Sequence, residues 1–345
     1  MRYVNLGASG LKVSRIALGM MTFGSPQWRP WVRPEEDAVP VVRRALDAGI
    51  NVFDTADMYS AGLSEEITGR LLRQYAPRDE IVIATKLYFP VDLAFKGGNA
   101  AGPKPPQRPN MSGLSRKRIM AAVDASLKRL GVDHIDLYQI HRFDPHTPVE
   151  ETMAALHEVV RSGKVRYLGA SSMWTWQFAQ MQFAAERHGF TKFVSMQNHY
   201  NLAYREEERE MIPFCRATGV GLLPWSPLAR GFLAGNRGRD DARRAAGGDT
   251  SRAATDDIAQ SYYYRDADFA VVDAVSRVAQ ARGVSHATVA YAWLLHQPGV
   301  SCPIVGASRP QQLDDALAAV DFPLSADEDA ALKSPYQPHP VLGHQ

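Results

Sequence analysis

Four side chains that could cooperate in proton transfer follow three short apolar runs of this sequence. Asp54 and Tyr59 come after the run 51–53, Lys86 comes after 81–85, and His141 comes after 135–140. A phenol has a pKa of about 10 in isolation; a neighbouring ammonium lowers that pKa, and a carboxylate can hold the ammonium in place. A neutral histidine can donate a hydrogen bond to a carbonyl oxygen that the tyrosine then protonates. Together these residue types indicate acid catalysis on a carbonyl group.

Each of these residues also has an ordinary explanation when it is taken alone. An aspartate at a strand end commonly caps a loop, and a lysine there can simply be solvated. Only their occurrence at three successive strand ends favours a shared site. His146 and His157 lack such a setting, since His157 falls inside a predicted helix. A metal-dependent hydrolase is disfavoured, because residues 19–22 (Gly-Met-Met-Thr) stand where a His-x-His pair is expected after the first strand.

The elements that must position these residues alternate regularly along the chain. Predicted strands begin near Ile16, Asn51, Ile81, Ile135, Val165, Phe193, Val220 and Pro303. Predicted helices cover 34–48, 115–130, 149–161, 175–187, 206–218, 269–281 and 286–296, and several are followed by glycine. The strands are continuous apolar runs, which is typical of a parallel sheet covered on both faces. We predict an α/β fold, a (β/α)8 TIM barrel, over an open doubly wound sheet, because no Gly-x-Gly-x-x-Gly turn follows the first strand.

The chain is longer than a barrel requires, and the surplus falls in three places. Its 345 residues would suit two domains of about 150 residues. A barrel of about 250 residues instead leaves the insertions 88–113 and 232–268 and the tail 335–345, so we expect a single domain over 1–345. Both insertions follow the carboxyl end of a strand, the face on which barrel active sites lie. Segments 3–6 and 11–14 flank residues 7–10 and predict a β-hairpin that plugs the opposite end.

Composition argues against several other kinds of protein. The 39 Lys and Arg residues against 37 Asp and Glu give a net charge of +2, without the basic excess of a nucleic-acid binder. Cys215 and Cys302 are too few for a disulfide framework or a Cys-rich zinc module, and two buried reduced thiols are favoured over one bridge. No apolar run approaches about 18 residues, and the N-terminus does not resemble a signal peptide. We expect a cytoplasmic enzyme with no membrane partner.

Two further segments have local interpretations. Residues 206–210 (Glu-Glu-Glu-Arg-Glu) are interpreted as a solvated helix start, acidic where the helix dipole favours acid. The three tyrosines 262–264 could contact substrate or cofactor from a lid, or could equally pack on the barrel rim. The sequence leaves the oligomeric state open.

Seven segments carry a resemblance to known proteins. They are 53–59 (Phe-Asp-Thr-Ala-Asp-Met-Tyr), 84–86 (Ala-Thr-Lys), 139–142 (Gln-Ile-His-Arg), 168–172 (Leu-Gly-Ala-Ser-Ser), 196–198 (Met-Gln-Asn), 225–228 (Trp-Ser-Pro-Leu) and 305–308 (Val-Gly-Ala-Ser). In this order they resemble the aldo-keto reductase family. Residues 21–24 (Met-Thr-Phe-Gly) and 338–341 (Pro-His-Pro-Val) are most similar to bacterial members that act on small aldehydes, ketones or sugars.

The resemblance implies a role for each matching residue. Tyr59 is the general acid, Lys86 and Asp54 tune it, and His141 orients the carbonyl. The implied cofactor is NADPH, held at its nicotinamide by Ser171, Ser172, Gln197 and Trp225. The other implied cofactor contacts are Met21, Asp54, Ser226, Leu228, Arg230, Gly306, Ser308, Arg309, Gln312 and Asp315. Arg309 favours NADPH over NADH, because a guanidinium suits the 2′-phosphate.

The expected substrate is a small carbonyl compound, in a pocket walled by Trp28, Trp31, Tyr88 and Phe89. Two residues depart from the family pattern, since Ser172 and Ala316 stand where many members have asparagine. The expected reaction is NADPH-dependent reduction of an aldehyde or ketone to an alcohol, with no metal. The alternative is a non-catalytic NADP-binding sensor or scaffold resembling potassium-channel beta subunits, which His141 argues against.

Overall fold

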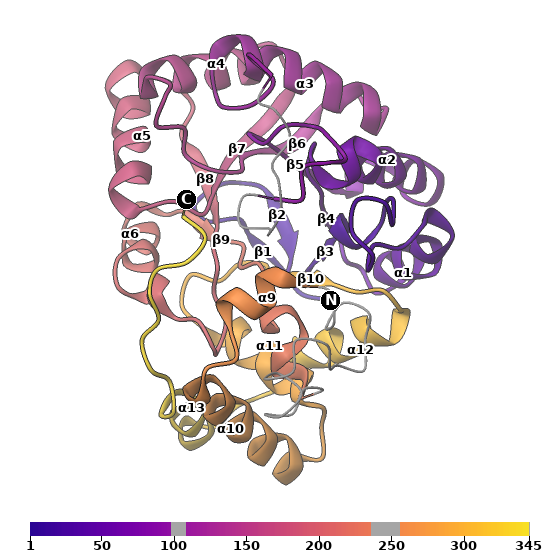
Figure 1. Ribbon diagram of the computed structural model, residues 1–345, viewed down its shortest axis with the longest axis vertical. Helices are drawn as coiled ribbons and strands as arrows, with labels where there is room; N and C mark the ends of the chain where they lie inside the picture. The colour runs from indigo at the N-terminus through magenta and orange to yellow at the C-terminus, as the bar shows by residue number, and fades with distance from the viewer. Residues whose placement is uncertain (98–107, 236–255, 345) are drawn as a thin grey trace.

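The computed structural model describes residues 1–97, 108–235 and 256–344, and its centre is a barrel of parallel strands (Figure 1). The strands are β3 (Ala17–Gly19), β4 (Val52–Asp54), β5 (Val82–Leu87), β6 (Ile135–Ile140), β7 (Val165–Ser171), β8 (Phe193–Gln197), β9 (Gly221–Leu222) and β10 (Ile304–Gly306). From β3 to β9 each strand pairs with the next, and β10 pairs with β3. The barrel closes between β9 and β10, where the Ile304 amide donates to the Pro224 carbonyl at 2.9 Å. The predicted (β/α)8 fold is confirmed.

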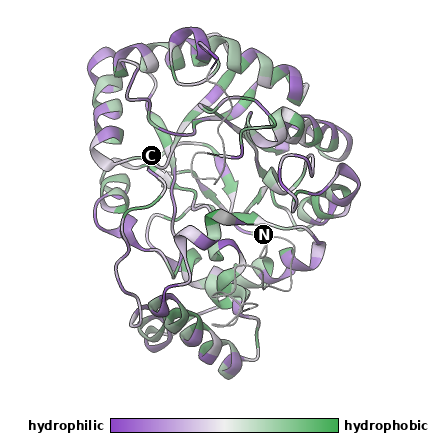
Figure 2. Cartoon of the chain, in the orientation of Figure 1, coloured by the Kyte–Doolittle hydropathy of each residue, from purple (hydrophilic) through white to green (hydrophobic). Residues whose placement is uncertain are grey.

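Helices surround the strands. They are α1 (Glu35–Asp47), α2 (Leu63–Tyr75), α3 (Arg116–Leu130), α4 (Val149–Arg161), α5 (Thr175–His188), α6 (Met211–Thr218), α9 (Asp257–Tyr262), α10 (Asp266–Arg282), α11 (His286–His296), α12 (Pro310–Ala319) and α13 (Ala326–Lys333). Figure 2 shows apolar residues concentrated on the strands and on the inner sides of the helices. Along the described parts of the chain, no helix combines the length and apolar character needed to span a membrane.

Local signals explain why several helices begin and end as predicted. The Ser115 hydroxyl accepts a hydrogen bond from the Arg118 amide and starts α3. Gly131 ends the same helix with φ 64°, in the left-handed region that glycine adopts without steric cost. Between these caps, apolar side chains repeat at helical spacing and are buried against the barrel.

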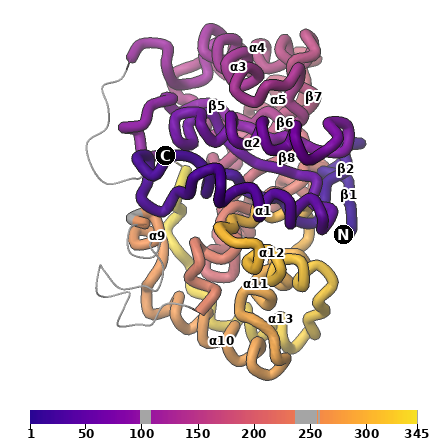
Figure 3. The backbone as a smooth tube through the Cα atoms, turned by 90° about the vertical axis from the view of Figure 1, so that its right-hand side faces the viewer, coloured from indigo at the N-terminus to yellow at the C-terminus, as the bar shows by residue number. Residues whose placement is uncertain are grey.

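A β-hairpin closes the amino-terminal end of the barrel. It pairs β1 (Tyr3–Asn5) with β2 (Lys12–Ser14) in antiparallel register. Leu6 is fully buried among residues at the barrel floor, including Val52 and Val82. Gly7 has φ 56°, and a Cβ there would lie 2.4 Å from the Gly219 carbonyl oxygen. Figure 3 shows this hairpin at one end of the molecule, with α9 and the C-terminus at the other.

The two insertions and the acidic run differ from the sequence expectations. Residues 98–107 and 236–255 lie outside the described part of the chain. The described residues of the second insertion include the end of η5 (Ala229–Ala234), the helix α9 and the start of α10. Helix α10 begins at Asp266, three residues before the predicted start at 269. The predicted helix 206–218 is divided into a 3-10 turn, η4 (Glu206–Glu208), and α6. Glu206 and Glu207 are buried and not solvated, because the tail covers them.

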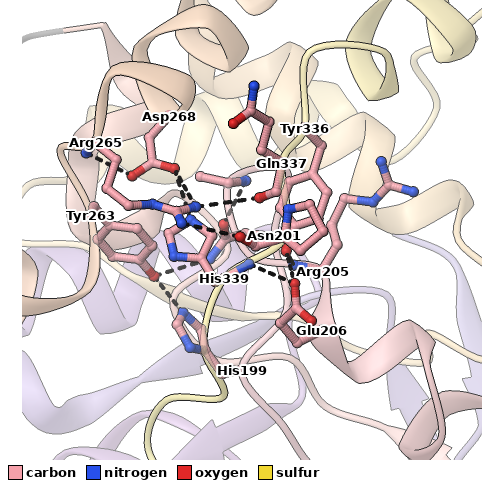
Figure 4. A network of polar contacts seen from close by, with 12 residues as sticks. His199, Asn201, Arg205, Glu206, Tyr263, Arg265, Asp268, Tyr336, Gln337 and His339 are labelled. Carbon is pink, nitrogen blue, oxygen red and sulfur yellow. Dashed lines mark hydrogen bonds and ion pairs between the residues drawn. The ribbon is translucent and has the colours of Figure 1, made fainter.

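The tail after α13 has no regular structure but is firmly bonded (Figure 4). The Tyr336 hydroxyl and the His339 amide donate to one carboxylate oxygen of Glu206, at 2.6 and 2.8 Å. The His339 Nε2 atom lies 2.8 Å from Asp268 Oδ1 on α10. The tail therefore joins the segment before α6 to α10.

Candidate active site

The four residues predicted to carry the chemistry come together at the carboxyl end of the barrel. Strands β4, β5 and β6 are neighbours, so Asp54, Lys86 and His141 leave adjacent positions of one rim. Lys86 is fully buried, and its Nζ atom lies 2.6 Å from Asp54 Oδ2 and 5.1 Å from the centroid of the Tyr59 ring. The rings of Tyr59 and His141 meet edge to face at 5.8 Å.

A strained turn fixes Tyr59 just after β4. Tyr59 opens the short helix η2 (Tyr59–Gly62), in which Ser60 and Ala61 have φ of 51° and 53°. Such left-handed conformations are costly for residues other than glycine and persist where the surroundings hold them. Asp57 anchors the approach to this turn through a buried ion pair with Arg118 on α3 at 2.8 Å. The loop therefore delivers the phenol to a defined place on the rim.

The carboxylate of Asp54 is the centre of a buried amide network. Its Oδ2 atom accepts from Lys86, and its Oδ1 atom accepts from the side-chain amides of Gln139 at 3.0 Å and Gln197 at 2.9 Å. Gln197 also donates to Gln139 Oε1 at 3.1 Å. Gln139 was absent from the predicted site, although it is the last residue but one of β6 and lies two residues before His141. Its position on an inward-facing strand end was the available signal.

Burial sets the protonation states of the acid and its neighbour. Burial raises the pKa of Tyr59 and outweighs Lys86, which lowers it, so the net direction is opposite to the one expected from the ammonium alone. Burial lowers the pKa of Lys86, but Asp54 and Tyr59 more than offset this and keep it charged. Burial, Lys86 and Arg142 lower the pKa of His141 well below its ordinary value. At neutral pH the site thus presents a protonated phenol and a neutral imidazole.

These groups open onto a cavity of about 630 Å³. Among the predicted substrate residues, Trp28, Trp31 and Phe89 line it, together with Tyr59, His141 and Asp54. Tyr88 is not among the residues lining this cavity; its ring packs edge-on against Phe89 at 5.0 Å. Lys86 also lies outside the lining, behind the Tyr59 ring. Around Tyr59 and His141, the cavity therefore combines an aromatic wall with two neutral hydrogen-bond donors.

The predicted cofactor residues other than Ser172 line the same cavity. Besides Asp54 they are Met21, Ser171, Gln197, Trp225, Ser226, Leu228, Arg230, Gly306, Ser308, Arg309, Gln312 and Asp315. Ser172 is set back from the cavity lining, and its hydroxyl oxygen accepts a hydrogen bond from Trp225 Nε1 at 2.9 Å. Ala316 is fully buried on α12.

Further aromatic residues pack around Trp225. The sequence left the roles of Tyr262 and Tyr263 open, and it did not single out His199. Tyr262 lines the cavity from α9, whereas Tyr263 is buried and hydrogen-bonded to His199 (Figure 4). His199 stacks on Trp225 at a centroid distance of 4.1 Å and an interplanar angle of 12°. Burial lowers the pKa of His199 well below its ordinary value, so the stacked ring is neutral. The position of His199 just after β8 was the signal that could have identified it.

The chemistry of the cavity lining fits a dinucleotide. Beyond Trp225 the backbone turns through left-handed conformations at Ser226, Ala229 and Arg230, with φ of 53°, 47° and 59°. The lining includes the N-terminus of α12, where Arg309 and the helix dipole both favour a negative group. Gly19 also lines the cavity. A Cβ added to this glycine would lie 2.9 Å from the Ile304 side chain, so a larger residue would require a shift there.

Comparison with known proteins identifies the class. The model of the aldo/keto reductase family matches residues 15–336, and the chain belongs to this family. A versiconal hemiacetal acetate reductase of Aspergillus parasiticus is 47% identical over 351 residues, covering 99% of this chain and 98% of the relative. A candidate aryl-alcohol dehydrogenase of Schizosaccharomyces pombe is 48% identical over 353 residues, covering 99% and 97%. The chain is therefore an oxidoreductase of a family that reduces carbonyl groups and generally uses NADH or NADPH.

An aldo-keto reductase of Fusarium vanettenii is 47% identical over 353 residues, covering 99% of this chain and 93% of the relative. These three relatives are fungal. The resemblance to bacterial members in particular finds no support among them.

Proposed function

We propose that this enzyme reduces an aldehyde or ketone to an alcohol with NADPH, and that Tyr59 donates the proton. The observation that carries the proposal is the Tyr59 ring edge to face with His141 at the cavity wall, with the buried Lys86–Asp54 pair beside it. His141 donates a hydrogen bond to the substrate oxygen and holds it near the phenol. Tyr59 then transfers its proton as negative charge develops on that oxygen. The buried Lys86 ammonium stabilises the phenolate that is left.

The cofactor residues are proposed from the cavity that they line. Ser171 and Gln197 hold the carboxamide, Trp225 stacks on the ring, and Arg309 with the α12 terminus receives the 2′-phosphate. When bound, the nicotinamide supplies the hydride that reduces the carbonyl carbon. The hydroxyl oxygen of Ser172 already accepts from Trp225, so we propose that it supports the stacking residue instead of replacing the family's asparagine amide. Residues from Gly19 to Asp315 form one cavity, which supports a single catalytic unit.

An aromatic carbonyl compound is the proposed substrate class. Trp28, Trp31 and Phe89 form an apolar cluster with the flanking Tyr59, and the rings of Trp28 and Tyr59 lie 5.9 Å apart. Flat faces of this kind favour a planar substrate through offset and edge-on contacts. The names of two relatives, an aryl-alcohol dehydrogenase and a versiconal hemiacetal acetate reductase, support the same class.

The substitution Tyr59→Phe tests the proton donor. Consumption of NADPH is followed with benzaldehyde and related aryl aldehydes and ketones. We expect turnover by the wild type and a loss of at least about a hundredfold in kcat/KM for the variant, the scale of general acid catalysis. NADPH affinity, measured by protein fluorescence, should stay within about threefold, because the phenol is a small part of the cofactor site.

Other outcomes separate the alternatives. Full activity in the Tyr59→Phe variant would remove the proton-donor assignment. Tight NADPH binding without turnover of any carbonyl compound would favour the NADP-binding sensor or scaffold.

A further inference from the structure

One guanidinium that lines the cavity has no acidic partner among the residues that the structure describes. Arg142 follows His141 directly, is half-buried and lines the cavity. Its Nη1 atom donates to the His141 carbonyl at 2.6 Å, and its guanidinium carbon lies 5.7 Å from the Phe89 ring centroid. Its Nε atom is buried and has no hydrogen-bond partner. Across the described residues, no carboxylate forms an ion pair with Arg142.

This arrangement differs from that of other arginines near the site. Arg33 pairs with Asp37 at 3.1 Å, and Arg230 pairs with Asp256 at 2.6 Å. The groups that face Arg142 electrostatically are the phenols of Tyr262, Tyr59 and Tyr88. An arginine stays charged in proteins, and holding it out of water without an anion is costly. The position of this charge is therefore suited to a ligand that brings the anion.

The surrounding charge points to the same kind of ligand. We call the part of the cavity lined by Trp28, Arg29, Trp31, Arg33, Phe89, Lys96 and Arg142 the substrate end. Lys96 Nζ donates to the backbone carbonyls of Gln27 and Leu93, at 2.7 and 2.8 Å. The two carboxylates among the described lining residues are Asp54, which is bound to Lys86, and Asp315 on α12. Among the described residues of the substrate end, Arg142 and Lys96 therefore contribute positive charge.

We propose that Arg142 binds a carboxylate of the carbonyl substrate, and that the enzyme prefers aromatic aldehydes or ketones that carry such a group. The proposal rests on the proposed reduction for its chemistry, but the anion site can be measured without it. A guanidinium and a carboxylate form two parallel, charge-assisted hydrogen bonds. Because Arg142 is adjacent to His141 in the chain, the carboxylate lies close to the carbonyl that His141 orients. The aromatic wall holds the ring that joins the two groups.

The test compares ligands that differ only in charge. The three isomers of formylbenzoate are matched with the corresponding formylbenzamides, which have nearly the same shape. Binding to the protein with NADP⁺ is measured by calorimetry, so that no turnover is needed, and kcat and KM are measured with NADPH. The variants are Arg142→Met and Arg142→Lys, and the control is Arg116→Met, which removes the same charge from the exposed face of α3.

We expect the wild type to bind at least one formylbenzoate about tenfold more tightly than its amide, the scale of a charged hydrogen bond. Arg142→Met should abolish this preference, mainly through a rise in the KM for the formylbenzoate, so that the acid and its amide are bound alike. Arg142→Lys should keep part of the preference, and it replaces the methionine variant if that variant does not fold. Arg116→Met should behave as the wild type.

Two results would overturn the proposal. The first is that the wild type shows no preference for any formylbenzoate over its amide. The second is that Arg142→Met weakens the binding of acids and amides equally, which would indicate that Arg142 acts only through His141. Preferential binding of a formylbenzoate without turnover of any aldehyde would contradict the proposed reduction and support the anion site.

Discussion

At the scale of single residues, the protonation states of the site come from burial more than from charge pairing. The sequence identified Tyr59, Lys86 and His141 because each lies at or shortly after the carboxyl end of a strand, and strand ends can be read from apolar runs. It did not give the direction of the Tyr59 pKa, because burial depends on elements distant in sequence. Arg142, Gln139 and His199 were missed for the same reason, since each matters only through neighbours on other strands. Tyr88 does not line the cavity as predicted, because its ring packs against Phe89 instead.

These protonation states predict the pH dependence of the reduction. With NADPH saturating, kcat/KM for an aryl aldehyde should be flat between about pH 6.5 and about pH 10, the ordinary pKa values of histidine and tyrosine. His141 titrates below this window and Tyr59 above it. As the pH rises through the Tyr59 pKa, the enzyme loses its proton donor and the rate falls. Initial rates across this range measure the profile, and an inflection near neutral pH would contradict it.

At the scale of elements, helix ends followed the sequence wherever the cap is local, as at Ser115 and Gly131. The acidic run did not, because its partners lie on the tail more than a hundred residues away. Burial alone would raise the pKa of Glu206, but bonds from Tyr336, Arg209 and the His339 backbone outweigh it and lower that pKa. Arg209 belongs to the run itself, but no local pattern at residues 206–210 indicates the partners on the tail.

The buried Glu206 predicts a pH-dependent contribution of the tail to stability. A carboxylate with a lowered folded-state pKa stabilises the fold above its ordinary value of 4.5, and this contribution disappears as the pH falls through the folded-state pKa. Glu206→Gln should lower the free energy of unfolding by about 1–3 kcal/mol at neutral pH. Urea unfolding should show this difference shrinking in acid. Glu210→Gln, at an exposed position of the same run, should change little at either pH.

At the scale of the whole molecule, stability and chemistry occupy opposite ends of the barrel. The alternation of apolar runs and amphipathic segments predicted the eight strands and the hairpin. The sequence could not predict that α9 lies in the second insertion and brings Tyr262 to the cavity, because that segment has weak helical periodicity. The position of Tyr262 depends on contacts with residues distant in the sequence, such as His199 and Trp225.

This separation predicts that the hairpin can be weakened without harming the site. Leu6→Ala removes a fully buried side chain from the barrel floor, and should lower the free energy of unfolding by about 2–5 kcal/mol. The KM for an aryl aldehyde and the affinity for NADPH should not change while the protein is folded. Denaturant titration and steady-state kinetics on the same sample test both parts. A large rise in KM would show that the two ends are coupled.

The buried cysteines have a practical consequence. Cys215 and Cys302 are both buried and free, and burial raises the pKa of each thiol. Because the thiolate is the reactive form, maleimides and other labelling reagents should leave the native chain almost unmodified at neutral pH. A single cysteine introduced on the surface would then carry a fluorophore or spin label at one known position. Movements of loops around the cavity could be followed in the otherwise natural protein.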